Sequence, residues 1–395
     1  MHRSLIKVAV QAAILTASIL GMAVASLAAG FLETDLVANK RPLTDSNGIP
    51  HTPAFLDPNL LNPWGLTASS SSPFWVSDNG AGVATLYNTA GTPQALVVSI
   101  PAPGDPLGSL GKKGTPTGTV FNIDPAASDF QISGVTAGGV PTKARAVFLF
   151  ATEDGTIVGW NPGVNPLGFD PTKAGTYGII AVDNSNIPIV GEGAVYKGLA
   201  IATDAGGTTR LYATNFRAGT VEVYDTNFKP VLVLGAFTDP KLPRGYAPFD
   251  IVPVSGKLVV TYAVQDASKH DDVAGMSHGI VDTFDLGGQS FQRLIQHGQL
   301  NSPWGVAVSP ASFGAFAGSL LIGNFGNGQI NAYNVTTGEF IDKIRDPHGQ
   351  AIVIDGLWSL RVGNGGNGGK TDTVYFTAGP NGEQDGLFGA ITPSP

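Results

Sequence analysis

Asn62-Pro63-Trp64-Gly65 begins the first of six copies of a pattern that repeats along the chain of 395 residues. In each copy a short apolar strand is followed by a gap, a second apolar strand, a turn rich in Gly, Asn or Asp, and a third strand. The starts lie about 50 residues apart, with one interval of about 80. They are Asn62-Pro63-Trp64-Gly65, Pro116-Thr117-Gly118, Tyr196-Lys197-Gly198, Pro248-Phe249-Asp250, Pro303-Trp304-Gly305 and Leu357-Trp358-Ser359.

These repeats predict an all-β chain folded as a six-bladed β-propeller, in which each repeat forms one four-stranded blade. The long interval holds a single second-and-third-strand signature at 147–161, so we interpret it as one blade with enlarged loops. Third strands are expected at 83–87, 156–160, 220–224, 279–284, 329–333 and 386–391. Fourth strands are expected at 95–100, 178–182, 231–234, 291–295 and 340–344.

The sixth repeat ends after its third strand and has no fourth strand of its own. An unpaired sheet edge favours aggregation, so a partner strand is expected. Residues 31–37, Phe-Leu-Glu-Thr-Asp-Leu-Val, precede the first repeat and belong to no other blade. We therefore predict that they pair with 386–391 and close the ring.

The first 28 residues have the layout of a secretory signal peptide. Arg3 and Lys7 precede an apolar run at 8–25, and small residues lead to a predicted cleavage site after Ala28. An uncleaved membrane anchor is the alternative, because the run could just span a bilayer. We expect a signal peptide at 1–28, a single propeller domain at 29–395, no membrane span in the mature chain, and export to an extracellular or periplasmic location.

Composition excludes several classes of function. The net charge of −8 argues against nucleic acid as a partner. The absence of cysteine removes thiol catalysis, zinc–thiolate sites and disulfides. The 53 glycines and 28 prolines are too few for a low-complexity chain, so a folded domain is expected.

In a propeller, the starts of the innermost strands and the loops between second and third strands share one end of the central channel. Here that end gathers amide, carboxylate and aromatic groups, which are typical of a ligand site. The loops at the other end are small, rich in Gly and Ser, and chemically poor. The candidate binding residues are Asp78, Asn79, Asp154, Lys197, Asn324, Trp64, Trp304 and Trp358, with Tyr246, Asp250 and Asp355 on the same face.

Each of these residues also has a structural interpretation. Asn and Asp at strand ends form turns through bonds to nearby backbone. Trp64, Trp304 and Trp358 could instead pack between blades.

One loop on this face, 265–279, is long and concentrates charged residues, and long loops on a rigid scaffold often carry function. His270, Asp271 and Asp272 are candidate catalytic residues, since a His/Asp pair can act as a general base. Calcium is the cofactor that the residues suggest, because it prefers oxygen ligands. Its candidate ligands are Glu153, Asn215 and Asp266. The alternative is a solvated loop that bonds to itself and covers the channel mouth.

Four segments together resemble a family of exported bacterial proteins of unassigned function. They are Glu33-Thr34-Asp35-Leu36-Val37, the run 57–65, Lys269-His270-Asp271-Asp272-Val273-Ala274-Gly275, and the ending 386–391. The resemblance implies a six-bladed propeller related in shape to NHL-repeat and gluconolactonase-like proteins, and it brings no catalytic residues. Metal-dependent lactonases of that shape hold calcium in the central channel.

Two functions follow as hypotheses. The first is a propeller that binds a small molecule, a glycan or a protein segment at the polar end of its channel. The second is a calcium-dependent hydrolase or lyase of the lactonase type, with Asp266, His270, Asp271 and Asp272 facing Glu153 and Asn215. Oxygens converging within about 2.3–2.6 Å of one point would favour the second.

Overall fold

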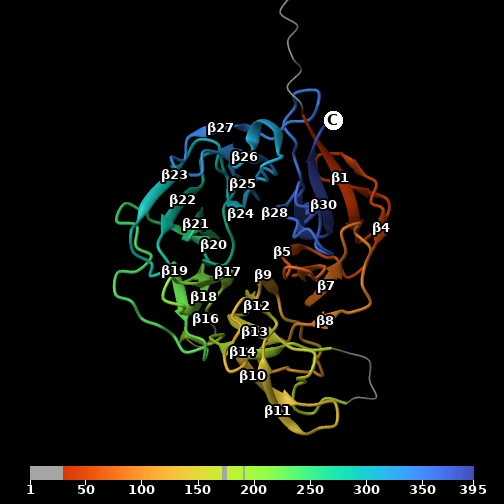
Figure 1. Cartoon of the computed structure of the whole chain (residues 1–395), viewed down its shortest axis with the longest axis vertical. Coiled ribbons are helices and arrows are strands. Elements are labelled where there is room, and N and C mark those ends of the chain that lie inside the picture. The colour runs from red at the N-terminus through yellow and green to blue at the C-terminus, as the bar shows by residue number, and fades with distance from the viewer. Residues whose placement is uncertain (1–29, 171–175, 190–191) are drawn as a thin grey trace, which may run out of the picture.

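The computed structural model describes residues 30–170, 176–189 and 192–395. Six sheets are arranged in a ring, which confirms the predicted six-bladed β-propeller (Figure 1). The predicted signal peptide at 1–28 lies outside the described residues. In the part of the chain that is described, no helix has the length and apolar character needed to cross a membrane.

The strands of each blade follow the chain outward from the channel. The innermost strands are β5 (Pro63–Thr67), β9 (Pro116–Phe121), β17 (Tyr196–Thr203), β20 (Tyr246–Val254), β24 (Pro303–Val308) and β28 (Leu357–Val362). The second strands are β6 (Phe74–Asp78), β12 (Phe148–Thr152), β18 (Thr209–Asn215), β21 (Lys257–Val264), β25 (Leu320–Asn324) and β29 (Val374–Ala378). The third strands are β7 (Val83–Tyr87), β13 (Thr156–Trp160), β19 (Thr220–Tyr224), β22 (Ile280–Phe284), β26 (Ile330–Tyr333) and β30 (Leu387–Pro393).

Outer strands complete five of the six blades. They are β8 (Val98–Ser99), β14 (Ile179–Asp183), β23 (Gln292–Gln296), β27 (Phe340–Lys343) and β1 (Phe31–Ala38). The short strand β4 (Phe55–Leu56) pairs with β1 and is the outermost strand of the last sheet. Further elements lie in the connections: β2 (Leu43–Thr44), β3 (Pro50–His51), β10 (Gln131–Val135), β11 (Pro141–Arg145), β15 (Pro188–Ile189), β16 (Glu192–Gly193), η1 (Gly314–Phe316) and α1 (Pro380–Glu383). The hairpin β10–β11 accounts for part of the long interval, which is one blade, as predicted.

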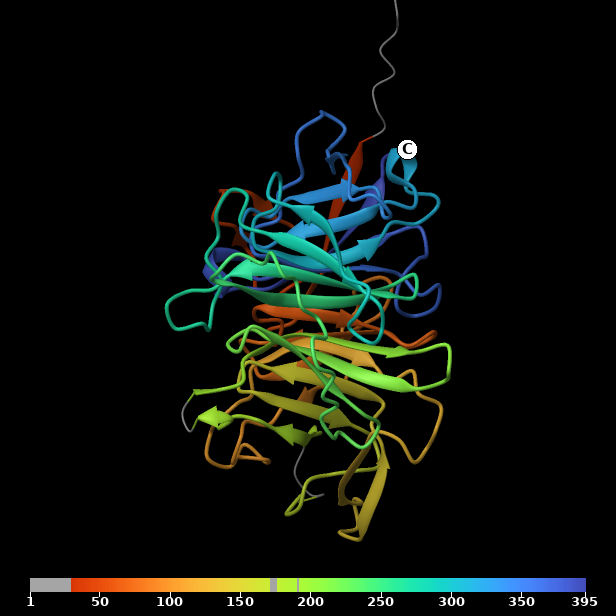
Figure 2. The ribbon, with the colours of Figure 1, turned by 90° about the vertical axis from the view of Figure 1, so that its left-hand side faces the viewer.

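The ring is closed by the first described strand. β1 pairs antiparallel with β30, so that Phe31 lies opposite Pro393 and Ala38 opposite Leu387. Figure 2 shows the red N-terminal strand beside the blue C-terminal one. The predicted closure is therefore confirmed, and the last blade gains the outer strand that its own repeat lacks.

The predicted fourth strand at 231–234 is wrong. The third blade is a three-stranded sheet, β17-β18-β19. The Val231 N–H donates to the Val223 carbonyl at 2.7 Å, and the chain then turns away, leaving Leu232 94% and Leu234 102% exposed. The preceding Pro230 has no N–H to donate, and an apolar run without a series of backbone bonds forms no strand.

Glycine at one repeated position lets the innermost strands approach each other. A Cβ atom on Gly118 would lie 2.4 Å from the backbone N of Leu199 in the next blade. Gly65 and Gly305 face the backbone of their neighbours in the same way. We call this ring of close approach the neck of the channel. The fourth and sixth blades have Asp250 and Ser359 at the corresponding position.

The closing strand should contribute measurably to stability through its buried face. Val37 is fully buried opposite Phe388, whereas Thr34 on the same strand is exposed. We expect Val37→Ala to lower the free energy of unfolding by about 2 kcal/mol, since it removes buried methyl groups and leaves a cavity. The control Thr34→Ala should change it by about 0.5 kcal/mol or less. Denaturant titration measures both, and equal small effects would contradict a sealed last blade.

Candidate polar site at the channel mouth

The polar end of the channel, which we call the mouth, is organised around a buried lysine. Lys197, the second residue of β17, is 1% exposed. Its ammonium group pairs with Glu153 from the β12–β13 loop and lies 3.3 Å from Asp271 Oδ1 of the β21–β22 loop. The same Nζ lies 4.9 Å from the centroid of the Trp64 ring, where an aromatic face attracts a cation. Residues from four blades therefore meet at one charge.

An amide chain extends this cluster across the mouth. The Asn79 side chain donates to Glu153 Oε2 at 2.8 Å, and Asn62 Nδ2 lies 3.4 Å from Asn79 Oδ1. Asn62 also donates to Glu383 Oε2 at 2.5 Å and accepts a bond from Trp358 Nε1 at 3.0 Å. The network thus runs from the fourth blade to the sixth and holds each polar group in place.

Two members of this network, Asn62 and Glu383, were missed by the sequence analysis. Both have left-handed backbone, with φ of 46° and 67°. Such conformations are unfavourable for residues other than glycine and are common at functional sites. The only sequence signal was their position, immediately before Pro63 and inside the last loop between a second and a third strand.

The protonation states of the side chains at the mouth follow from their contacts and burial. The hydrogen bond with His270, whose Nδ1 lies 2.9 Å from Asp271 Oδ1, lowers the pKa of Asp271 to about 2. The same bond raises the pKa of His270. Burial, together with the charge of Glu153, raises the pKa of Glu383 to about 7. Glu383 can therefore give or take a proton near neutral pH.

Burial alone would lower the pKa of Lys197, but Glu153 and Asp271 outweigh that effect and raise it. The lysine is consequently charged, and the two carboxylates compensate it. One ligand atom each from Glu153, His270 and Asp271 lies within 4.8 Å of the others, a spacing that a metal ion could use. The Lys197 ammonium already provides the positive charge at this point.

The other predicted metal ligands, Asn215 and Asp266, do not join this group. Asn215 donates to Glu222 Oε1 at 2.7 Å and accepts a bond from the Ala218 N–H at 3.1 Å. Asp266 accepts from Ser268 Oγ at 2.6 Å and from the His270 N–H at 2.8 Å, inside its own loop. Both side chains are therefore occupied in local turns.

Three predicted binding residues have a structural role, because their side chains form hydrogen bonds that hold loops and strands together. Asp78 is fully buried and accepts from Thr85 Oγ1 at 2.7 Å, and burial raises its pKa well above the usual range. Asp154 accepts from the N–H and Oγ1 of Thr115 at 2.8 and 2.9 Å. Asn324 donates to the Gln299 carbonyl at 2.7 Å. Asp272 follows Asp271 and is half-buried, and burial raises its pKa.

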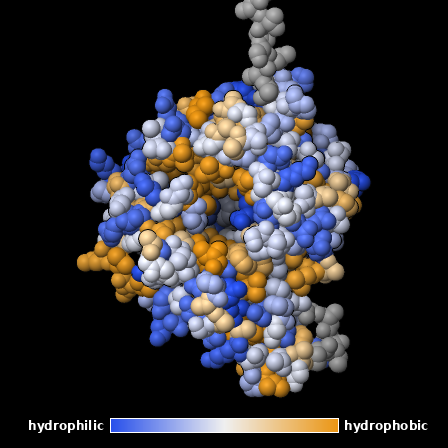
Figure 3. All heavy atoms as spheres, in the orientation of Figure 1, coloured by the Kyte–Doolittle hydropathy of each residue, from blue (hydrophilic) through white to orange (hydrophobic). Residues whose placement is uncertain are grey.

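The three tryptophans form a floor beneath the mouth. Trp64, Trp304 and Trp358 are 2%, 3% and 1% exposed. The Trp64 and Trp358 rings stack with centroids 3.4 Å apart, and Trp304 meets both edge-on at 6.0 and 5.8 Å. With Phe216 and Phe249 they make up what we call the aromatic plug. Figure 3 shows a hollow at the centre of the ring.

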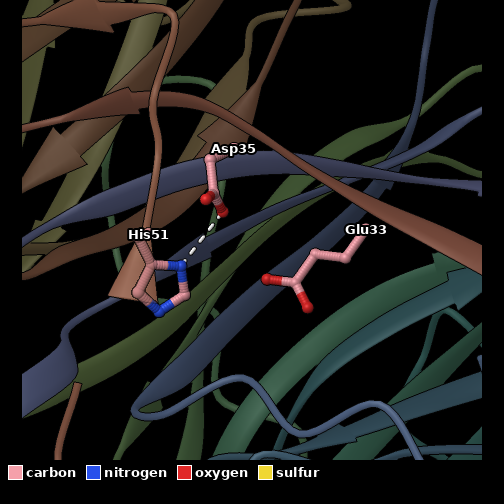
Figure 4. A group of neighbouring side chains, drawn as sticks. All are labelled: Glu33, Asp35 and His51. Atoms are coloured by element: carbon pink, nitrogen blue, oxygen red, sulfur yellow. Dashed lines mark hydrogen bonds and ion pairs between the residues drawn. The ribbon is translucent and has the colours of Figure 1, made fainter. Parts of the chain in front are cut away.

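A second group of titratable side chains lies on the closing strand, far along the chain from the loops of the mouth. Glu33 and Asp35 project from β1 toward His51 of β3, as Figure 4 shows. His51 Nδ1 lies 3.1 Å from Asp35 Oδ1, and the Thr52 N–H donates to Asp35 Oδ2 at 2.8 Å. These bonds fasten the β2–β3 hairpin to the last blade.

The fold defines the chain as a six-bladed β-propeller, and solved propeller structures resemble it at low sequence identity. Virginiamycin B lyase from Staphylococcus aureus is 12% identical, with a TM-score of 0.44 over 92% of this chain and 99% of its own. The soluble aldose sugar dehydrogenase from Escherichia coli is 13% identical, with a TM-score of 0.48 over 90% of this chain and 99% of its own. These likenesses concern the fold alone.

Sequence relatives are more informative about ancestry. Two uncharacterized proteins of Acanthamoeba polyphaga mimivirus are 30% identical over 346 and 347 residues, which cover 86% of this chain and 76% and 82% of theirs. The chain belongs to the family of these two proteins. No family model matches the chain. Because these relatives are viral, they give no support to the bacterial origin that the resemblance implied.

Glu383 should make stability depend on pH in a defined direction. Its carboxyl binds a proton more tightly in the folded chain, near pKa 7, than in the unfolded chain, near 4.5. Its contribution to the unfolding free energy therefore falls as pH rises from about 4.5 to about 7. Glu383→Gln removes this loss, so the variant should be up to about 3 kcal/mol more stable than the wild type at pH 8 and equal to it near pH 4.5.

Denaturant unfolding at several pH values measures this difference. Glu339→Gln, on an exposed outer turn, is the matched control and should follow the wild type at every pH. A constant difference between Glu383→Gln and the wild type would contradict the raised pKa.

Proposed function

We propose that this chain is an exported propeller that binds a small polyhydroxylated ligand, such as a saccharide, at the mouth of its channel. One observation carries the proposal: the Lys197–Glu153–Asp271 cluster, built on a buried lysine, holds outward-facing polar groups in fixed positions. The Asp271 side chain is 66% exposed and that of His270 is 37% exposed. Export is supported by Arg3, Lys7 and the apolar run that follows them.

Hydroxyl groups suit this mouth because each can both donate and accept a hydrogen bond. Asp271 and Glu383 offer acceptors, and His270 offers a ring nitrogen. Asn62 and Asn79 hold the neighbouring groups rigid, which lowers the cost of ordering the site when a ligand binds. A neutral ligand also avoids competition with the internal charge pair.

The calcium-dependent hydrolase or lyase has less support from these contacts. A divalent ion bound to Glu153 and Asp271 would either displace the Lys197 ammonium group or be repelled by its positive charge. Asn215 and Asp266, which that mechanism would use, are bonded elsewhere.

Saturation-transfer NMR with a panel of neutral mono- and disaccharides tests the proposal. We expect at least one saccharide to bind the wild-type chain, and Asp271→Asn with His270→Ala to weaken that saccharide about tenfold, the loss of one or two hydrogen bonds to a charged group. Glu339→Gln should bind like the wild type. Binding of none of the panel, or equal binding by the mouth variant, would overturn the proposal. Binding of basic peptides instead would assign the mouth to a protein segment.

Removing the Lys197 charge should allow a metal ion to bind to the carboxylates that the lysine now pairs with. Lys197→Met leaves Glu153 and Asp271 without their cation, so we expect about 3–5 kcal/mol less stability. Zn²⁺ or Ca²⁺ should then raise the melting temperature of the variant and leave the wild type nearly unchanged, because a ligand specific to the folded state stabilises it. Exposed Lys257→Met is the control. An equal rise in the wild type would favour the calcium-dependent alternative.

A further inference from the structure

Beyond the aromatic plug the channel continues as a separate cavity. Its volume is about 490 Å³, and it runs along the innermost strands to the loops that join first and second strands, at Ser255 among others. We call it the lower cavity. Its walls combine polar groups with apolar side chains, which include Leu66, Leu199, Ile251, Val306 and Leu360.

Asp250 is the carboxylate of this cavity. The sequence analysis placed it at the mouth, but β20 carries it past Phe249 of the aromatic plug, and it lines the lower cavity instead. The residue is 5% exposed. Its Oδ1 atom occupies the room left by Gly198, where a Cβ atom would lie 2.4 Å away.

The fold has no visible need for this carboxyl group. The Asp250 N–H donates to Thr261 Oγ1 at 3.0 Å, and the corresponding N–H groups of Gly198 and Ser359 donate to Thr214 and Thr377 in the same way. Glycine and serine therefore make the same backbone bond without a carboxyl. Within the described chain, the backbone N–H of Ile251 is the hydrogen-bonding neighbour of the Asp250 carboxyl, and no side chain pairs with it.

A buried carboxyl with so little compensation is costly, because burial penalises the charged form. Burial accordingly raises the pKa of Asp250 well above its usual range. The other charged residue of the cavity, Arg361, forms no ion pair with it in the described chain; its Nη2 donates to the Ala68 carbonyl at 3.1 Å. The carboxyl thus lines the cavity without an ion-pair partner among the described residues, although Arg361 shares the walls of the cavity.

We propose that the lower cavity binds a small primary ammonium ion with a short alkyl chain, and that Asp250 is its ion-pair partner. An ammonium group brings a positive charge that can pair with the Asp250 carboxylate, together with N–H donors. The apolar side chains of the walls suit an alkyl chain, and the volume falls in the range of small-ligand sites. This site is at the opposite side of the plug from the mouth and does not depend on the function proposed for it.

Isothermal titration calorimetry of the full chain with n-butylammonium chloride and with n-butanol tests the assignment. We expect n-butylammonium to bind at least tenfold more tightly than n-butanol, which has the same chain and no charge. Asp250→Asn, which keeps the shape and removes the charge, should lose at least tenfold in affinity for n-butylammonium. Glu339→Gln, which removes one exposed carboxylate, should bind like the wild type.

A second variant covers the case in which Asp250→Asn does not fold. Asp250→Ser introduces the residue that the sixth blade has at this position. Because it removes the costly buried carboxyl group, the variant should melt at a higher temperature than the wild type. It should also lose the binding of n-butylammonium. Equal affinity for n-butanol, unchanged binding by both variants, or no binding by the wild type would each overturn the proposal. Saccharide binding at the mouth is measured separately, so either proposal can fail without the other.

Discussion

The close approach of the six innermost strands is the constraint on which the rest of the structure depends. Gly118 has its neighbour's backbone where a Cβ atom would be, and Gly65 and Gly305 are equally confined. Strands this close leave a narrow channel, so the aromatic residues one position earlier can only be accommodated by stacking on each other. The resulting aromatic plug divides the channel into the mouth and the lower cavity.

This division gives each half of the channel its own electrostatics. Above the plug, the Lys197 charge is compensated by Glu153 and Asp271, and removing Lys197 or Glu153 would leave a buried charge without its nearest partner. Below the plug, the Asp250 carboxyl has a backbone N–H as its hydrogen-bonding neighbour and no ion-pair partner in the part of the chain that is described. The charge of Lys197 is therefore balanced within the protein. The Asp250 carboxylate, in contrast, would gain an ion-pair partner from a cation that enters the cavity.

Much of the fold could be predicted because its signals are local and periodic. The repeated strand starts and turns determined the number of blades, and the absence of a last strand indicated the closure by β1. The error at 231–234 arose because apolar residues alone do not provide backbone pairing, and Pro230 removes a donor where the strand would begin.

The site was less predictable than the fold, since its contacts depend on three-dimensional closure. Asn62 bonds to Glu383, which is more than 300 residues away in sequence, and both adopt left-handed backbone that composition does not reveal. Asp154 was correctly placed on a loop, whereas Asn324 is the last residue of β25. Both bond within the scaffold, so residue type alone could not separate structural residues from ligand-binding groups. A comparison of equivalent positions in the six repeats separates structural residues from ligand-binding residues more clearly. Lys197 stands where three other blades have tryptophan, and Asp250 where four have glycine. Equivalent positions share one backbone environment, so local structure explains neither charge. The explanation lies in what each charge faces: Lys197 faces two carboxylates, and Asp250 faces a cavity.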